Sequence, residues 1–451
     1  MTIPPLRQFK RKDLSPDQSL SPWKAEGKIC DIIGNLIEAR LPASRLGTVT
    51  EIDTGSVKER LYAEVVGFRK DKTLLLPYSE LRGIQSGSMI REHSFSGHIH
   101  VGKGLLGKVL DPFMQPLVSG FQNYQSKMHL VPLDKAALNP MERRRITRPL
   151  NLGIRAIDGL LTMGAGQRLG IMAGSGVGKS VLMGMIARGS ESDVNVIGLI
   201  GERGREVREF IEKELGEDGL KKSVVVVATG DQSPLMRIRA AKAVFSISEY
   251  FSSEGKNVLL MMDSLTRVAH AQREIGLAIG EAPTSKGYTP SVFSLLPRLL
   301  ERSGPQQDGH GPISGLYTVL VDSDDFNDPL VDSARSILDG HIQLSRSLAA
   351  QGHFPAIDIS NSVSRVMNDV VSKEHYELAR QIKTLLACWE ENLDFIQLGT
   401  YQEGINPLLD QAIKIMPLIR KFVRQPMDVL TSRGDIISGM TDIIRFLQSP
   451  T

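Results

Sequence analysis

Long apolar runs are missing from this sequence of 451 residues. Stretches such as residues 258–262 and 224–228 are far shorter than the roughly 18 residues that a membrane-spanning helix requires. The first residues, Met-Thr-Ile-Pro-Pro-Leu-Arg, lack the apolar segment of roughly 7–15 residues that a secretory signal contains. We therefore expect a protein without a transmembrane segment that stays in the cytoplasm.

Cysteine and an excess of charge of one sign are also scarce. Cys30 and Cys388 are far apart and outside any Cys-x-x-Cys spacing, which argues against a disulfide framework or a thiolate metal site. We expect both to be buried small side chains. The 54 Lys and Arg residues nearly balance 51 Asp and Glu, giving a net charge of +3. Any electrostatic function must therefore be local.

The chain divides into segments of different composition, and its length predicts about three domains at roughly 150 residues each. Residues 23–96 hold short β-rich runs punctuated by Gly and Pro, which predict a β-barrel. Residues 97–149 are expected to connect it to the next domain. From 150 to 365, apolar runs alternate with helical patterns, as in a parallel α/β sheet. Residues 366–451 are expected to form a helical domain.

Particular strands and helices are predicted within the last two segments. Apolar runs predict strands at 168–173, 194–201, 223–229, 258–263 and 316–321. Helical periodicity predicts helices at 374–391 and 410–423.

Residues 1–22 carry four basic residues between positions 7 and 12 and two Ser-Pro pairs, a composition that predicts a mobile basic arm. This arm is either a solvated tail or a segment that becomes helical on a partner. In the second case Leu6, Phe9 and Leu14 would form its apolar edge.

Residues 173–180, Ala-Gly-Ser-Gly-Val-Gly-Lys-Ser, follow an apolar strand and precede a helical segment, which is the context of a phosphate-binding P-loop. Small residues let backbone N–H groups turn toward phosphates, Lys179 reaches the β and γ oxygens, and Ser180 can bind Mg²⁺. The flanking pattern disfavours a surface turn with a chance Gly-Lys-Ser. The predicted nucleotide-binding residues are Gly174, Ser175, Gly176, Val177, Gly178, Lys179, Ser180 and Val181.

Two carboxylates follow other predicted strands. Asp263 ends the apolar run 258–263, the Walker B arrangement that places an acid beside Mg²⁺; the alternative is a buried strand with a capping Asp. Glu202 follows the run 194–201 and could polarise an attacking water as a general base. Equally, Glu202 could cap a helix or pair with Arg203 or Arg205.

Residues 355–364, Pro-Ala-Ile-Asp-Ile-Ser-Asn-Ser-Val-Ser, precede Arg365 and by themselves predict an ordered polar loop. The decapeptide matches the signature of the rotary ATPase α/β-subunit superfamily, in which the next residue is the arginine finger. Together with the P-loop and the Gly-Glu-Arg at 201–203, it makes the chain resemble the ATPases of type III export, flagellar or virulence-associated. The Asn-Asp-Pro at 327–329 favours the flagellar branch.

This resemblance extends from about residue 23 to the C-terminus. It implies a P-loop (RecA-like) parallel-sheet core, an N-terminal β-barrel and a C-terminal helical domain. It also implies a Mg²⁺-dependent ATPase that forms a homohexameric ring, with nucleotide at the subunit interfaces.

Site roles carry over position by position. Lys179 and Ser180 match the residues that bind phosphate and Mg²⁺, Glu202 matches the catalytic carboxylate, and Asp263 matches the Walker B acid. Arg203 matches an arginine that contacts the γ-phosphate.

Two further residues correspond to the signature and its flanks. Arg365 matches the arginine supplied to a neighbouring subunit's site. Phe354 aligns with an aromatic that packs on adenine, usually Tyr in relatives.

The resemblance implies partners as well. The N-terminal arm would bind a regulatory, stator-like protein, and the C-terminal helices would meet a central-stalk protein and export substrates or chaperones. A membrane-embedded export gate would place the ring at the inner face of the cell membrane.

Two other functions compete. Hexameric RNA translocases share such a core, but Trp23, Tyr62, Phe68 and Tyr78 do not form the clear aromatic and basic cluster expected of an RNA-binding barrel. A nucleotide-binding structural subunit without turnover is the other possibility.

Overall fold

The computed structural model describes residues 25–55, 60–93, 97–118, 128–321, 325 and 327–448. The basic arm expected at 1–22, and Trp23, lie outside these residues. The chain splits into two compact units, one ending at Gly97 and one beginning at His98. No helix among the described residues has the length and hydropathy needed to cross a bilayer.

The first unit is a closed six-stranded barrel in the order β1-β2-β5-β4-β3-β6, which confirms the predicted β-barrel. Its core is made of buried aliphatic side chains, among them Ile29, Ile37 and Leu75; buried and half-buried positions alternate along most of β4, whereas β2 and β5 are buried at nearly every position. Cys30 on β1 is half-buried, so the expectation of a buried side chain is wrong there, whereas Cys388 is buried. The strands are β1 Glu26–Ile33, β2 Leu36–Arg40, β3 Val49–Ile52, β4 Leu61–Arg69, β5 Lys72–Pro77 and β6 Met89–Glu92.

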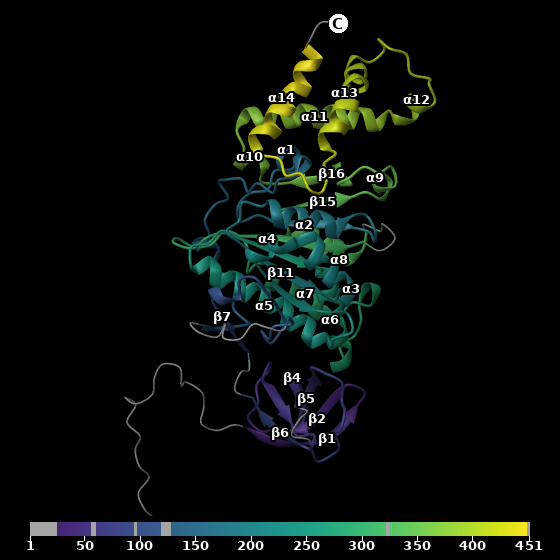
Figure 1. The fold of residues 1–451 in the computed structure, drawn as a ribbon. Coiled ribbons are helices and arrows are strands. Elements are labelled where there is room, and N and C mark those ends of the chain that lie inside the picture. The colour runs from purple at the N-terminus through teal and green to yellow at the C-terminus, as the bar shows by residue number, and fades with distance from the viewer. Residues whose placement is uncertain are drawn as a thin grey trace, which may run out of the picture. The chain divides into compact units, whose positions relative to one another are not determined.

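The second unit is built on an eight-stranded sheet in the order β16-β15-β10-β14-β13-β11-β12-β8 (Figure 1). Every neighbouring pair is parallel except β15 and β16, which are antiparallel. The strands are β8 Lys108–Leu110, β10 Arg168–Ala173, β11 Val194–Ile200, β12 Ser223–Ala228, β13 Val258–Asp263, β14 Ile313–Leu320, β15 Gly340–Leu344 and β16 Ile357–Ser364.

The five predicted strands are all present in this sheet. β14 begins at Ile313 rather than at 316, because Ser314 and Gly315 interrupt the apolar run although both are buried. The prediction of a polar loop at 355–364 is wrong: residues 357–364 form β16, an edge strand that exposes Ser360, Asn361 and Val363. β8 lies in the segment expected to be a connector and pairs with β12.

Helices flank the core sheet. α5 packs against β11, β12 and β13, and α6 packs against β14. In Figure 1, α2 and α4 lie on the opposite side of the sheet from α5 and α6. The longer of these helices are α2 Lys179–Gly189, α5 Pro234–Ser253, α6 Leu265–Ile279, α7 Pro290–Leu300 and α8 Pro329–Ile337. Shorter elements are β7 His98–Val101, β9 His129–Pro132, α3 Gly204–Glu209, a π-helix at Phe210–Leu215, α4 Gly216–Lys221 and α9 Arg346–Ala350.

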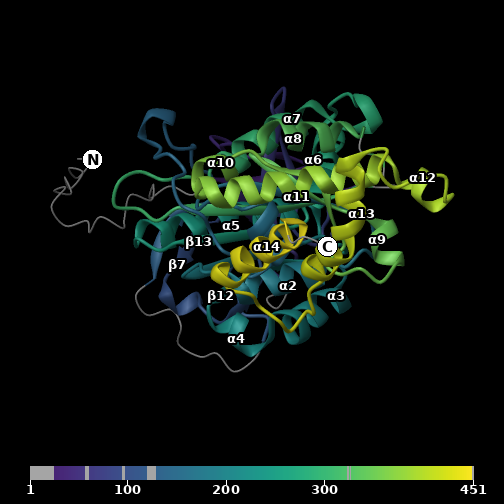
Figure 2. The same ribbon diagram turned by 90° about the horizontal axis from the view of Figure 1, so that it is seen from above.

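The last part of the chain is helical, as predicted, and α11, α13 and α14 pack on one another and on α1 (Figure 2). Their contact faces are apolar and buried, as Ile382, Ile415 and Met440 illustrate. The predicted helices 374–391 and 410–423 are confirmed, while α14 was not predicted. The helices are α1 Arg155–Leu160, α10 Met367–Val370, α11 Lys373–Glu391, α12 Leu393–Gln397, α13 Pro407–Val423 and α14 Arg433–Gln448.

Candidate active site

The predicted phosphate-binding loop lies where β10 ends and α2 begins. Residues 174–178 turn between the two elements, with Gly176 and Gly178 at φ of 75° and 88°, a conformation that glycine adopts without steric cost. α2 starts at Lys179, so its first backbone N–H groups point out of the helix end and favour an anion there. The loop therefore has the geometry that its sequence predicted.

Three charged side chains meet beside this loop because β10, β11 and β13 all run in one direction. The ammonium of Lys179 lies 2.5 Å from Asp263 Oδ1 and 3.2 Å from Glu202 Oε1. All three are mostly buried, with exposed side-chain fractions of 12% for Lys179, 18% for Glu202 and 4% for Asp263. The residues predicted at three separate strand ends thus form one cluster.

The electrostatics of the cluster distinguish its two acids and its base. Burial raises the pKa of Glu202 to about 7, and the negative charge of Asp263 adds to this rise while Lys179 opposes it. Burial lowers the pKa of Lys179, but Asp263 and Glu202 outweigh burial, and the net shift is upward. Lys179 is therefore an ammonium at neutral pH, while Glu202 can exchange a proton near neutrality.

The donor atoms near Lys179 fit Mg²⁺. Asp263 supplies carboxylate oxygens and Ser180 an exposed hydroxyl in the first turn of α2, and oxygen is the ligand that Mg²⁺ prefers. Among the described residues no group of three or more His, Cys, Asp or Glu side chains could hold a metal alone. In the usual Mg²⁺ site of nucleotide enzymes one or two protein ligands act together with substrate phosphates, and Asp263 and Ser180 supply that number of ligands.

Two of the remaining predicted residues also lie at this edge. Phe354 is 47% exposed, and its ring is 3.5 Å from where a Cβ on Gly178 would be. Arg203 precedes α3, and its guanidinium is 83% exposed and pairs with Glu206 at 3.4 Å rather than with the Lys179 cluster. The structure thus brings Phe354 to the loop and leaves the guanidinium of Arg203 at the surface.

Arg365 lies at the opposite edge of the sheet, where the parallel strands have their amino ends; we call this the amino edge, and the edge with the phosphate loop the carboxyl edge. β16 starts opposite Leu344, near the carboxyl ends of the parallel strands, and ends with Ser364 opposite Gly340, near their amino ends. β16 pairs with the five residues of β15 across a bulge, a length of roughly 13–17 Å at the usual rise. Arg365 is exposed and follows directly, so it cannot reach the phosphate loop of its own chain.

Comparison with known proteins matches three segments of the chain to described families. Residues 29–92 match the β-barrel domain of the ATP synthase alpha/beta family, and residues 153–364 match its nucleotide-binding domain. Residues 371–442 match the T3SS EscN ATPase C-terminal domain. The flagellum-specific ATP synthase of Bacillus subtilis is 48% identical over 422 residues, covering 93% of this chain and 95% of the relative. This chain belongs to the family of flagellar and type 3 secretion ATPases.

Other relatives come from both branches. The type 3 secretion system ATPase of Xanthomonas euvesicatoria is 46% identical over 427 residues, covering 94% of this chain and 95% of the relative. Among solved structures, the assembled ATPase EscN from the enteropathogenic E. coli type III secretion system superposes with a TM-score of 0.87 at 45% identity, covering 93% of this chain and 100% of that one. EscN in complex with its central stalk EscO gives a TM-score of 0.85.

One residue of the site was missed by sequence reasoning. Thr318 on β14 donates its hydroxyl to Asp263 Oδ1 at 2.7 Å and is fully buried. The sequence signal was weak, because Thr318 is one of two hydroxyl-bearing residues, with Tyr317, in the apolar run predicted as a strand at 316–321. Its relevance became visible once β14 was found next to β13 in the sheet.

Proposed function

We propose that this chain is a Mg²⁺-dependent ATP hydrolase that forms a homohexameric ring with nucleotide at subunit interfaces and energises protein export through a type III apparatus of the flagellar kind. The carrying observation is the contact of Lys179 with both Glu202 and Asp263 beside the phosphate loop. An ammonium and two acids at the end of a P-loop are what phosphoryl transfer to water requires.

Binding in this proposal falls to residues 174–181 and Phe354. The backbone N–H groups of the loop hold the phosphates, Lys179 binds the β and γ oxygens, and the Phe354 ring packs on adenine. Ser180 and Asp263 hold the metal. Bound Mg²⁺ supplies positive charge to the β and γ phosphates.

Glu202 is the proposed general base. Its raised pKa lets it accept a proton from the attacking water near neutral pH, which a fully exposed glutamate does less well. Arg203 follows Glu202 directly, and its exposed guanidinium has the freedom to leave Glu206 and contact the γ-phosphate.

The ring follows from the position of Arg365. An arginine that stabilises the transferring phosphoryl group has to come from another copy, because β16 places this one at the far edge of its own sheet. A contact between two different surfaces of identical chains repeats from copy to copy and closes into a ring when the rotation between copies completes a full turn. The assembled state of the similar EscN supports this arrangement.

The partners are proposed by analogy. EscN binds the central stalk EscO, and in this chain Phe395, Leu398 and Ile405, which are exposed near α12, offer an apolar surface for a stalk or for export substrates and chaperones. The N-terminal arm would bind the stator-like regulator. The ring would work in the cytoplasm, next to an export gate at the inner face of the membrane.

Hydrolysis and assembly can be tested together. Phosphate release should depend on Mg²⁺, and its rate per subunit should rise with protein concentration as rings form. Poly-ribonucleotide should not stimulate it; a stimulation that falls steeply with salt would favour an RNA translocase instead. Absence of turnover in concentrated protein with Mg²⁺ would contradict the proposal.

The flagellar branch needs a cellular test. Deleting the gene should abolish motility, and a plasmid copy should restore it, whereas a Glu202→Gln copy should not. Retained flagella with loss of effector secretion would assign the chain to the virulence branch, to which relatives of similar identity also belong.

A further inference from the structure

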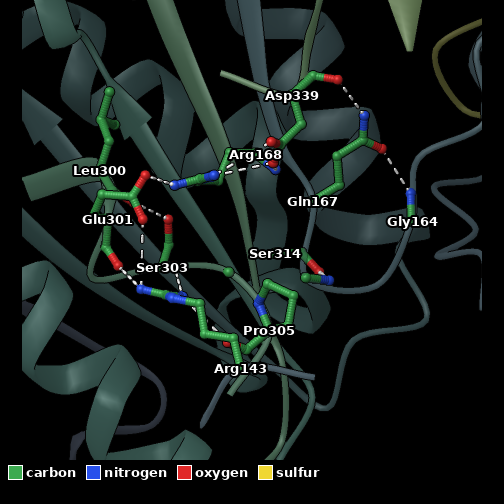
Figure 3. A network of polar contacts seen from close by, with 12 residues as sticks. Arg143, Gly164, Gln167, Arg168, Leu300, Glu301, Ser303, Pro305, Ser314 and Asp339 are labelled. Carbon is green, nitrogen blue, oxygen red and sulfur yellow. Dashed lines mark hydrogen bonds and ion pairs between the residues drawn. The ribbon is translucent and has the colours of Figure 1, made fainter. Parts of the chain in front are cut away.

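The amino edge of the sheet, which carries Arg365, contains an ion-pair network whose residues have no role in the proposed nucleotide site. Arg168, the first residue of β10, donates Nη1 to Glu301 Oε1 at 2.5 Å. Its guanidinium also donates two hydrogen bonds to the carboxylate of Asp339, from Nε to Oδ2 at 3.2 Å and from Nη2 to Oδ1 at 3.3 Å (Figure 3). The guanidinium is mostly buried, with 16% of the side chain exposed.

Asp339 joins this network to Arg365 through the backbone. Its carbonyl oxygen accepts the N–H of Arg365 at 3.1 Å. The same oxygen accepts Nε2 of Gln167 at 3.0 Å, and that amide also donates to Ser364 Oγ at 3.0 Å. The residue before Arg365 and the backbone of Arg365 itself are therefore held by neighbours of Arg168.

The network also reaches the segment that enters this unit. Arg143 donates Nη1 to the carbonyl oxygens of Ser303 and Pro305 at 2.9 and 3.2 Å, and its Nη2 lies 3.7 Å from Glu301 Oε2 (Figure 3). Glu301 is thus shared by Arg143 and Arg168. A carboxylate between two guanidinium groups has fewer alternative positions, so Glu301 helps to hold the Arg168 side chain against Asp339.

We infer that Arg168 is a positioning residue for Arg365: by fixing Asp339, with Gln167 beside it, it aims the Arg365 guanidinium at the active site of the adjacent copy. The inference rests on the proposed function of Arg365. The Arg365 side chain itself is exposed and has one hydrogen bond to protein among those described, from Nη2 to the carbonyl oxygen of Arg335 at 3.4 Å. Its reach is therefore set by its backbone, and a displacement of about 1 Å can cost about 100-fold in rate.

β10 makes the inference open to a decisive test, because it carries Arg168 at one end and leads into the phosphate loop at the other. If the Arg168 substitution changed the structure of β10 as a whole, it would lower activity at the chain's own nucleotide site. If the substitution only displaced Arg365, it would leave that site intact and lower activity only at the site of the neighbouring copy. Subunit mixing separates the two cases.

The variant is Arg168→Gln, mixed in equal amounts with Glu202→Gln, which keeps its own Arg365 but lacks the base. Alone, Arg168→Gln should lower kcat about tenfold or more, with KM for ATP changed less than about twofold. Mixing should restore activity, because each Arg168→Gln site can receive Arg365 from a Glu202→Gln neighbour. With random assembly, about a quarter of all sites combine an intact Glu202 with a correctly positioned Arg365 from the neighbour. No recovery on mixing would overturn the inference.

Three further samples make the result interpretable. Arg237→Gln breaks a comparably buried pair, Arg237 with Glu274 at 2.8 Å, on helices α5 and α6 and should leave kcat within about twofold. Asp339→Asn keeps the carbonyl that holds Arg365 and should resemble Arg168→Gln more weakly; it replaces Arg168→Gln if that variant fails to fold. Arg365→Ala mixed with Glu202→Gln tests the proposed function itself: failure there rejects the role of Arg365, whereas recovery there without recovery for Arg168→Gln rejects only the positioning role.

Discussion

The two edges of the core sheet differ in what their charged residues contact. At the carboxyl edge, Lys179 contacts both Glu202 and Asp263 beside the phosphate loop. At the amino edge, Arg168 pairs with both Glu301 and Asp339, while the exposed Arg365 makes one described side-chain hydrogen bond, to the carbonyl oxygen of Arg335. In the ring proposed above, the exposed Arg365 of one copy meets the Lys179 cluster of the next.

β16 shows the same contrast along one strand. Phe354, just before it, touches the chain's own loop at Gly178, whereas Arg365, just after it, is at the opposite edge. Residues before the strand should therefore act on their own nucleotide, and the residue after it should act on a neighbour's.

The largest effect is expected from Lys179→Ala. Removing the ammonium leaves Glu202 and Asp263 facing each other without a cation and takes away the γ-phosphate ligand, so turnover should fall at least about 1,000-fold. Phosphate release measures it. In a mixture with Arg365→Ala, activity should return only at the Arg365→Ala sites. The Lys179→Ala subunit can donate its Arg365 to such a site, but its own site cannot hydrolyse ATP. Turnover within tenfold of wild type would contradict the arrangement.

Glu202→Gln should come next, with kcat reduced about 100- to 10,000-fold while ATP binding persists. The amide keeps the size of the side chain and an oxygen for Lys179 but cannot take a proton. A fluorescent nucleotide measures binding beside the rate. Glu212→Gln, an exposed change on the following helix, is the matched control and should leave both quantities unchanged. Normal turnover by Glu202→Gln would remove Glu202 from the chemistry.

The pH dependence of kcat/KM should show a limb near neutrality. Burial and Asp263 raise the pKa of Glu202 to about 7, and only the deprotonated carboxylate acts as a base. Activity should therefore fall about tenfold per unit as the pH drops below 7 and level off above about 8. A plateau extending down to pH 5 would show that Glu202 titrates as an ordinary glutamate.

Phe354→Ala should have the smallest effect, a rise in KM for ATP of about three- to tenfold with kcat little changed, because only ring packing is lost. Phe354→Tyr should behave like wild type. Since Phe354 acts on its own chain's nucleotide, mixing Phe354→Ala with Glu202→Gln should not restore the wild-type KM. A restored KM would place this ring at a neighbour's site.

Sequence reasoning succeeded where a local pattern determines a structure. The β-barrel, the five core strands and the phosphate loop followed from apolar runs and glycine spacing, and the positions of Glu202 and Asp263 at strand ends followed from the same runs. It failed for β16, because an edge strand with exposed Ser and Asn positions has the composition of a loop. β8 is only three residues long and gave no pattern.

The contribution of Thr318 and the location of Arg365 depend on which strands are neighbours in the sheet. No local pattern contains that order, so the division between the two edges required the structure. The catalytic roles of the site residues stay predictions.

The most direct test of that division is subunit mixing of Arg365→Ala with Glu202→Gln. Each variant alone should be nearly inactive, because one lacks the donated arginine and the other lacks the base. Mixed in equal amounts, they should recover up to about a quarter of wild-type phosphate release, since sites pairing an intact Glu202 with a neighbour's intact Arg365 arise at that frequency. A mixture no more active than the two variants measured apart would contradict the assignment of these residues to opposite sides of one interface.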